Sequence, residues 1–324
     1  MYIRPEQVLE QYDFEVKAVQ KGRDGYLCDT SRGTLVLKEY RGSKERAEFL
    51  AGMLTHLRSE HILVETVIRT KEGEPLAVSE DESKYMVKAA FCGTECDTKS
   101  RDSMLAGAGA LAKLHHAACS YEGEVPEFVK VGENELLYLY EKHNRELRKV
   151  KNYIRGKKKK NEFEVMFADH YARFMEKAEA VTIRLSEAGE QGRVGFCHGD
   201  YNQHNVIFSM QEIAVVHFDN FSYQIQVGDL ANFMRKMLEK NGWNTGLGTD
   251  LIAAYDKVRR LSKQELECLY SYLAYPEKFW KIANRYYNTH KAWLSGRSIE
   301  KLEKLIRQEE QKEQFLQMLF HFTT

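Results

Sequence analysis

The chain has 324 residues, of which 43% are apolar, and it carries 48 basic and 48 acidic side chains. A chain of this length can bury a substantial core, more naturally as two lobes than as one. Its formal net charge of zero provides no global field that would hold it on nucleic acid or on an anionic membrane. Neither is therefore expected as a partner.

The first residues and the cysteines bear on location. The start is charged and broken by Pro5, so it lacks the apolar core of a secretory signal, and no apolar run approaches membrane-spanning length. We expect cytoplasmic synthesis without a signal peptide. The six cysteines lie mostly in apolar or helical stretches, which is typical of buried thiols in a reducing compartment. Cys92 and Cys96 form the one close pair, and zinc there would need two more soft ligands that the sequence does not offer.

Alternating apolar runs dominate the first 90 residues and indicate an antiparallel sheet. The expected strands cover 14–20, 26–30, 34–40, 62–70, 74–80 and 83–91. Between the third and fourth runs, residues 43–58 carry apolar side chains at helical spacing, with Ser43 placed to cap the start. The segment 71–75 has the composition of a hairpin turn. These features predict a small α+β lobe over residues 1–90.

From residue 91 to 324 the pattern changes to long helical periodicities, which predict a larger, mainly helical lobe. One interruption, over 193–223, contains two short apolar runs that predict a β-hairpin. The basic run at 155–160 is interpreted as a solvated helix end or loop, with a phosphate-binding patch as the alternative, because acidic residues follow directly.

A polar motif, "CHGDYNQHN", lies inside that interruption and suggests chemistry. If its side chains converge, Asp200 could accept a proton from a hydroxyl, and Asn205 offers a neutral oxygen to a hard cation such as Mg²⁺. Phosphoryl transfer needs a base, a metal ligand and a phosphate-holding cation, because its transition state depends on positioning and charge neutralisation.

Lys38 is the candidate for that cation. Strand alternation places it on the face opposite Leu35 and Leu37, which form the more apolar side, so its ammonium should face solvent or a cleft. An unpaired buried ammonium is costly, so an acid should meet it if it is enclosed. On the following helix Glu48 is our first choice for that acid and Glu45 the second.

These features together resemble a known family. The strand "LVLKEY", the helix with its glutamate, "LAKLHHAA", His-x-Asp-x-x-x-x-Asn and "VGDLANF" follow one another as in the aminoglycoside phosphotransferase and choline kinase branch of the protein-kinase-like fold. More narrowly, the basic helical insert and "DLANFMRKMLEKNGW" resemble CotS-type spore coat proteins. The resemblance covers about residues 10 to 310 and implies a bilobal fold and a location in the spore coat.

The resemblance also implies roles for single residues. Lys38 would contact the phosphates of ATP and pair with Glu48, Asp200 would be the catalytic base, Asn205 a metal ligand, and His198 a support for the loop. The glycine-rich lid of protein kinases is represented only by the hairpin tip at 22–25.

Two further regions receive implied roles. Asp229 would brace the backbone of the catalytic loop, and it also suits the N-cap of the helix that follows. The hinge facing adenine would be formed by the backbone of Lys88, Ala89, Ala90 and Phe91.

The metal position departs from the family pattern. Active relatives end the next strand in Ile-Asp-Phe-Asp or a close variant, and counting back from Asp229 puts His217 where the main Mg²⁺ ligand should be. A neutral imidazole is a poor Mg²⁺ ligand. If the segment is extended, His217 and Asp219 share one face, and a small shift would let Asp219 substitute.

Three functional hypotheses follow. The first is a spore coat phosphotransferase that uses ATP and Mg²⁺ on a small-molecule or saccharide hydroxyl, and the second is a catalytically degenerate kinase-like scaffold that binds other coat proteins. The third is a transition-metal hydrolase built on His198, His204, His217 and Asp219, which requires those side chains to converge. No sequence pattern identifies the acceptor.

Overall fold

The computed structural model describes residues 5–22, 25–132, 134–189, 192–210, 212–288 and 296–322. It divides into two compact units, one formed by Met1–Lys130 with Gly195–Tyr223 and the other by Val131–Val194 with Gln224–Thr324. The first unit contains the sheet and the polar motif, and the second is helical.

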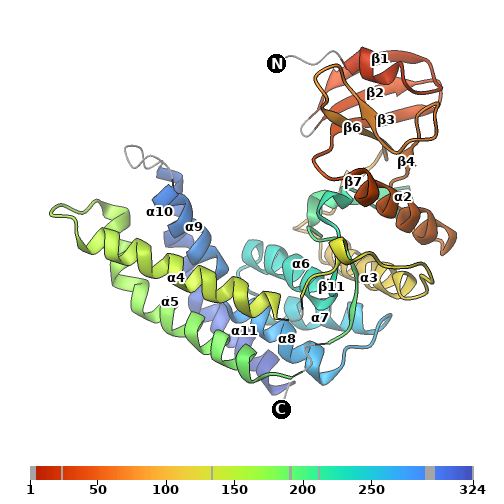
Figure 1. Cartoon of the computed structure of the whole chain (residues 1–324). Coiled ribbons are helices and arrows are strands. Elements are labelled where there is room, and N and C mark those ends of the chain that lie inside the picture. The colour runs from red at the N-terminus through yellow and green to blue at the C-terminus, as the bar shows by residue number, and fades with distance from the viewer. Residues whose placement is uncertain are drawn as a thin grey trace. The chain divides into compact units, whose positions relative to one another are not determined.

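The first unit is built on an antiparallel sheet (Figure 1) with the strand order β1-β2-β3-β6-β4. Strand β5 also pairs with β6, at a different point from β4. Its described strands are β1 (Val16–Lys21), β2 (Tyr26–Thr30), β3 (Gly33–Glu39), β4 (Val67–Ile68), β5 (Ala77–Val78) and β6 (Lys84–Ala89). The short helix α1 (Pro5–Leu9) packs on one face with Leu35 and Leu37 of β3. Lys38 lies on the opposite face, as the alternation predicted.

The predicted hairpin at 71–75 is wrong in its pairing, although a turn is present. The Thr70 N–H donates to the Glu74 carbonyl oxygen at 2.9 Å. However, β4 and β5 both pair with β6, at different points along it, and not with each other. After the two residues of β4 the chain turns away from β6, and it pairs with β6 again in β5. Strand β6 is long enough to pair with both short strands.

The predicted first helix is confirmed as α2 (Lys44–Ser59). The Ser43 side chain accepts a hydrogen bond from the Arg46 N–H, which satisfies one of the free donors of the first turn. Its apolar stripe, including Leu50, Met53 and Leu57, is fully buried. This burial fixes which side chains of the first turn, Arg46 among them, face away from the core.

The predicted hairpin after the polar motif is also present. The strand β9 (Val206–Ser209) pairs with β10 (Glu212–Val215) and, on its other side, with β7 (Thr94–Glu95). A parallel bridge joins Val64 to Val215. The remaining regular elements here are α3 (Arg101–Ala118), β8 (Val194–Cys197), which pairs with β11 (Ser222–Ile225), and the short 3₁₀ helices η1 (Glu127–Val129), η2 (Gln203–Asn205) and η3 (Phe218–Asn220).

This pairing explains why the compact units differ from the predicted lobes of 1–90 and 91–324. Strand β7 lies beyond residue 90 but pairs with β9, so the motif region and the chain up to Lys130 belong to the same unit as the sheet. The α+β class is unaffected, because the segments that changed unit keep their secondary structure.

Among its described residues the second unit is helical, apart from the ends of β8 and β11 that fall within it. Its helices are α4 (Glu135–Arg155), α5 (Glu162–Glu187), α6 (Val227–Lys240), α7 (Thr245–Asp256), α8 (Lys263–Ala274), α9 (Glu277–Asn288), α10 (Gly296–Arg307) and α11 (Glu309–His321). Helices α4 and α5 run side by side (Figure 1) over a core of aromatic and aliphatic side chains that α9 and α10 complete. The basic run 155–160 is the connection between α4 and α5, as predicted. None of the described helices has the length and apolarity needed to cross a membrane.

Candidate functional site

The polar motif forms a loop that is held by neutral hydrogen bonds. His198 is fully buried, and its Nε2 lies 2.8 Å from the carbonyl oxygen of Val216, while the Asp200 N–H donates to its Nδ1 at 3.2 Å. The carbonyl must accept and the amide must donate, so the neutral Nε2–H tautomer satisfies both contacts. His198 therefore links the Asp200 N–H to the carbonyl oxygen of Val216, and the supporting role that the resemblance implied stays a prediction.

Gly199 allows the loop to approach the next segment closely. Its φ is +80°, and a Cβ at this position would lie 1.9 Å from the carbonyl oxygen of Asn220. Only glycine fits both the left-handed conformation and this contact. The loop and residue 220 are thus packed backbone to backbone.

Asn205 also contacts the loop backbone. Its amide nitrogen donates to the carbonyl oxygen of Asp200 at 2.8 Å, and Asn202 donates to the same oxygen at 2.9 Å. The side-chain carbonyl oxygen of Asn205 is then its one atom able to coordinate a cation. The carboxylate of Asp200 is partly exposed, so a general base there would have access to a ligand.

A chain of four charged groups lies beside this loop. The Lys38 Nζ is 2.6 Å from Asp219 Oδ2, the Lys88 Nζ is 3.0 Å from Asp219 Oδ1, and Lys88 also lies 2.7 Å from Glu65 Oε1. Lys88 and Glu65 are about 95% buried, whereas Lys38 and Asp219 are partly exposed. Two ammonium groups and two carboxylates give a neutral cluster.

The charges stabilise each other in place of solvent. Burial acts to raise the pKa of the Asp219 carboxyl, but the Lys88 and Lys38 ammonium groups hold that pKa well below its usual range. Burial likewise acts to lower the pKa of Lys88, and the Glu65 and Asp219 carboxylates more than offset it, so the pKa of Lys88 is raised. The pKa of the Glu65 carboxyl is lowered as well, against its burial, by Lys88 and by the two backbone N–H groups it accepts from, so Glu65, Lys88 and Asp219 are charged at neutral pH.

Glu65 connects this cluster to the backbone at the metal position. Its Oε2 accepts from the His217 N–H at 2.9 Å and its Oε1 from the Phe218 N–H at 3.0 Å. His217 has a left-handed backbone, with φ of 67°, and burial lowers the pKa of its imidazole. A neutral imidazole therefore occupies the position of the expected metal ligand.

The extended geometry that would let Asp219 replace that ligand is not formed. His217 is left-handed and residues Phe218–Asn220 form η3, so the strand alternation on which the substitution depended does not apply. Glu65 holds this conformation through the hydrogen bonds that its carboxylate accepts from the two backbone N–H groups. Asp219 reaches the site, but both of its oxygens contact lysine ammonium groups.

The residues present do not fit a Mg²⁺ ion. Mg²⁺ requires near-octahedral oxygen coordination, usually from one or two carboxylates. Here the candidate donors are the neutral His217, the Asn205 carbonyl oxygen and an Asp219 whose two oxygens each contact an ammonium group. A divalent ion on Asp219 would lie directly beside two positive charges.

The predicted pair of Lys38 and Glu48 is not formed. The Glu48 carboxylate accepts two hydrogen bonds from Arg69, at 2.9 and 2.7 Å, and this planar double contact suits a guanidinium better than an ammonium. Glu45 is exposed in the first turn of α2. Lys38 contacts Asp219 instead.

The predicted hinge lies at the end of β6. The N–H groups of Ala89 and Ala90 donate to the carbonyl oxygens of Thr66 and Thr34, at 2.9 and 3.1 Å. The hinge role of residues 88–91 remains a prediction. The N–H groups of Ala89 and Ala90 already donate to other backbone carbonyl oxygens. The Lys88 side chain, for which the sequence suggested no role, points into the charged cluster. The hairpin tip at 22–25, which was compared with the glycine-rich lid of protein kinases, includes residues 23 and 24, and these two lie outside the described part of the chain.

Asp229 belongs to the second unit, where it is buried in the first turn of α6. The N-cap of this helix is Gln226, three residues earlier than predicted, so Asp229 occupies the third helical position. A carboxylate there still interacts favourably with the helix N-terminus. Its role as a brace for the loop remains a prediction.

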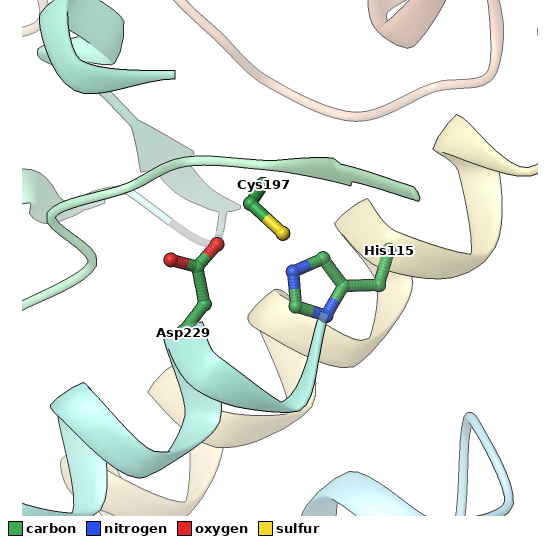
Figure 2. Close-up of side chains that lie close together, drawn as sticks. All are labelled: His115, Cys197 and Asp229. Atoms are coloured by element: carbon green, nitrogen blue, oxygen red, sulfur yellow. The ribbon is translucent and has the colours of Figure 1, made fainter. Parts of the chain in front are cut away.

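Neither predicted zinc alternative is supported by the described residues. His204 contacts Glu95, and both ring nitrogens of His198 contact the backbone, so these rings do not converge on one point with His217. Cys92 is exposed while Cys96 is buried. Figure 2 shows His115 of α3 beside Cys197, with a ring nitrogen and the Sγ within 4.8 Å of each other.

The sequence also contains a signal for the charged cluster, which lies outside the motifs considered above. Glu65 and Lys88 are each the one charge inside an apolar run, "ILVETV" and "YMVKAAF". The test applied to Lys38, that an enclosed ammonium should meet an acid, applies equally to this pair.

With this geometry established, known proteins provide a comparison. The family described as "Spore coat putative kinase YutH" matches residues 5–319. The chain belongs to this family. Spore coat protein S of Bacillus subtilis (strain 168) is 24% identical to it over 334 residues, which cover 97% of this YutH-family chain and 93% of that relative. The predicted resemblance to CotS-type spore coat proteins is confirmed.

Solved structures confirm the kinase-like fold. An aminoglycoside phosphotransferase from Alicyclobacillus acidocaldarius superposes with a TM-score of 0.86 at 19% identity, covering 99% of this chain and 96% of that one. The amicoumacin kinase hAmiN, in complex with AMP-PNP, Ca²⁺ and Ami, gives 0.65 at 14% identity, covering 96% and 92%. At these identities the likeness shows the fold alone.

Proposed function

We propose that this spore coat protein acts by binding, as a kinase-like component of coat assembly, and does not carry out metal-dependent phosphoryl transfer. The observation that carries the proposal is the contact of both Asp219 oxygens with the ammonium groups of Lys38 and Lys88. The neutral His217 at the metal position supports it independently.

The electrostatics of the cluster explain why the metal would be disfavoured. A divalent ion on Asp219 would have to displace Lys88 or tolerate its charge at close range in a partly buried site, where screening is weak. Displacing Lys88 would leave the buried Glu65 without its partner, which is strongly unfavourable. The cluster is thus more compatible with a site that holds no metal.

A second function, an ATP-dependent phosphotransferase acting on a small-molecule or saccharide hydroxyl, is favoured by one specific observation. The loop around Asp200 keeps its supports from His198 and Asn205, and the Asp200 carboxylate is partly exposed. A catalytic base would need this arrangement. The nucleotide and Ca²⁺ in the amicoumacin kinase complex show that the fold accommodates both in that protein.

Turnover of ATP distinguishes the two functions. We would measure ADP release by the full chain with Mg²⁺ or Mn²⁺, across aminoglycosides, amino alcohols and sugars, for the wild type and for Asp200→Asn. We expect the wild type to release no more ADP than the Asp200→Asn variant. Metal-dependent turnover that disappears in Asp200→Asn would contradict the proposal and establish the enzyme.

Coat assembly in spores tests the binding role. A strain that carries Asp200→Asn should build the same coat as the wild type, while a deletion strain should show a defect. An Asp200→Asn strain as defective as the deletion, with the variant protein present at normal level, would contradict a role based on binding.

A further inference from the structure

Helix α4 and its connection to α5 carry a strong concentration of positive charge. Residues 142–160 contain ten lysine and arginine side chains and one acidic side chain, although the whole chain has no net charge. The six cations on α4 itself are all exposed, and together they are called the basic face: Lys142, Arg145, Arg148, Lys149, Lys151 and Arg155. As a helix, the stretch from the first of them to the last is about 20 Å long.

The basic face consists of two rows along α4. Apolar side chains of this helix, such as Leu147 and Val150, pack into the core of the second unit, so the positions between them point outward. Side chains three and four residues apart align on one side of a helix. The cations follow these intervals, with Lys142, Arg145 and Lys149 in the first row and Arg148, Lys151 and Arg155 in the second.

Most of this charge lacks an ion-pair partner among the described residues. Arg148 pairs with Glu179 of α5 at 2.6 Å, and Arg145 lies 4.0 Å from Glu141. The other four cations of the basic face make no ion pair within the described ranges. Glu146, the one acid of the segment, instead accepts a hydrogen bond from the Trp280 indole at 2.7 Å. Like charges at these intervals repel each other, and an anionic partner would relieve that repulsion.

The lysines of the connection to α5 are presented by an ordered turn. The Lys157 ammonium contacts Glu164, a fully buried carboxylate that also closes a capping box with Asn161 at the start of α5. Residues 158–160, all lysines, are exposed beside this anchor, where α4 and α5 are joined at one end of the pair (Figure 1). A surface that is already ordered loses less entropy when it binds a partner.

A cavity of about 430 Å³ lies between α4 and α5, beside the second row of cations. Arg148 and Lys151 line its α4 side, while Glu176, Glu179 and the apolar Met175 line its α5 side. A nucleic acid carries a negative charge at every phosphate, so it would meet these carboxylates as well as the cations. A polypeptide can instead place acidic side chains on the cations and an apolar side chain in the groove. The mixed lining therefore favours a polypeptide.

We propose that the basic face of α4, with the lysines of residues 157–160, is a docking surface for an acidic segment of a partner polypeptide. This inference rests on the proposed function, because it gives the chemical character of the partner that a binding role requires. An extended chain advances about 3.3 Å per residue, so about six residues would follow the whole basic face. Complementary charge of this kind provides specificity and rapid association.

Binding of a random Glu–Tyr copolymer to the full chain tests the inference, with duplex DNA and phosphatidylserine vesicles as competing anions. The copolymer should bind, and its affinity should fall as salt is raised, because exposed charges are screened. DNA and the vesicles should bind at least tenfold more weakly. Either of them binding as tightly as the copolymer would overturn the assignment to a polypeptide.

Neutralising the first row is the decisive change. The triple variant Lys142→Gln, Arg145→Gln and Lys149→Gln should weaken copolymer binding at least tenfold. Its thermal midpoint should equal or exceed that of the wild type, since like charges are removed from one side of the helix. Cations with a merely structural role would lower the midpoint and leave binding unchanged. Lys158→Gln with Lys159→Gln, outside the helix, should weaken binding by a smaller factor.

Helix α10 offers a matched control, because it also carries three exposed cations at helical spacing. The control variant makes the same change in net charge, through Arg297→Gln, Lys301→Gln and Lys304→Gln. It should bind the copolymer as the wild type does.

The inference is overturned if the α4 variant binds the copolymer as tightly as the wild type. It is also overturned if the α10 variant loses as much affinity, which would show a response to net charge alone. Both failures are read in copolymer binding, whereas the proposed function fails on Asp200-dependent turnover of ATP, so the two are distinguishable.

Discussion

The loop at 198–205 and the segment at 216–220 lie side by side but are held by different forces. The loop depends on neutral hydrogen bonds between side chains and backbone, with His198 and Asn205 as the main supports. The segment depends on ionised groups, with Glu65 bonded to its backbone and two lysines bonded to Asp219. The loop that the sequence predicts to be catalytic is thus held by neutral contacts, while the segment at the predicted metal position is held by an internal ion-pair cluster.

The largest expected effect comes from breaking that cluster at Lys88. Lys88→Met leaves Glu65 buried and charged without its ion-pair partner, so the free energy of unfolding should fall by about 3–5 kcal/mol. Lys84→Met, at an exposed position of the same strand, should change it by less than about 0.5 kcal/mol. Urea unfolding of both variants measures the difference.

A double variant sharpens this test. Lys88→Met combined with Glu65→Leu removes both buried charges, and most of the lost stability should return, because apolar side chains can replace a buried ion pair at little cost. If Lys88→Met alone unfolds like the wild type, the cluster does not hold the segment, and the contrast with the loop is wrong.

Gly199 tests the neutral side of the comparison. Gly199→Ala and Gly73→Ala both place a Cβ at a left-handed residue, with φ of +80° and +84°, but only at Gly199 would the Cβ meet another atom. The left-handed backbone alone costs about 1–2 kcal/mol. Crowding against Asn220 should add about 1–3 kcal/mol for Gly199→Ala. Equal losses in urea unfolding would show that the close approach of loop and segment contributes nothing.

The sequence predicted the parts of this site whose signal is local. Alternation placed Lys38 on the correct face of β3, the Ser43 cap began α2, and the spacing from Asp229 identified His217. The partners of Lys38 could not be predicted in the same way. Asp219, which pairs with Lys38, is 181 residues away from it in the sequence. The expected partner Glu48 is bound by Arg69 instead. Pairings between distant charged residues depend on strand register and on competing partners, which periodicity does not encode.

The smallest expected effect concerns pH. The lysines hold the pKa of Asp219 below its unfolded value of about 3.9, so the unfolded state takes up the proton first as pH falls. The charged Asp219 therefore adds about 2 kcal/mol to the free energy of unfolding above about pH 5. This stabilisation is lost as pH falls through the pKa of Asp219 in the folded protein. The difference in unfolding free energy between wild type and Asp219→Asn should be constant from pH 7 to 5 and shrink below pH 4. Lys38→Met, which keeps the Lys88 contact, should retain part of this pH dependence. A difference that is the same at pH 3 and pH 7 would mean that Asp219 is not held by the two ammonium groups, and the metal position would then be open to a cation after all.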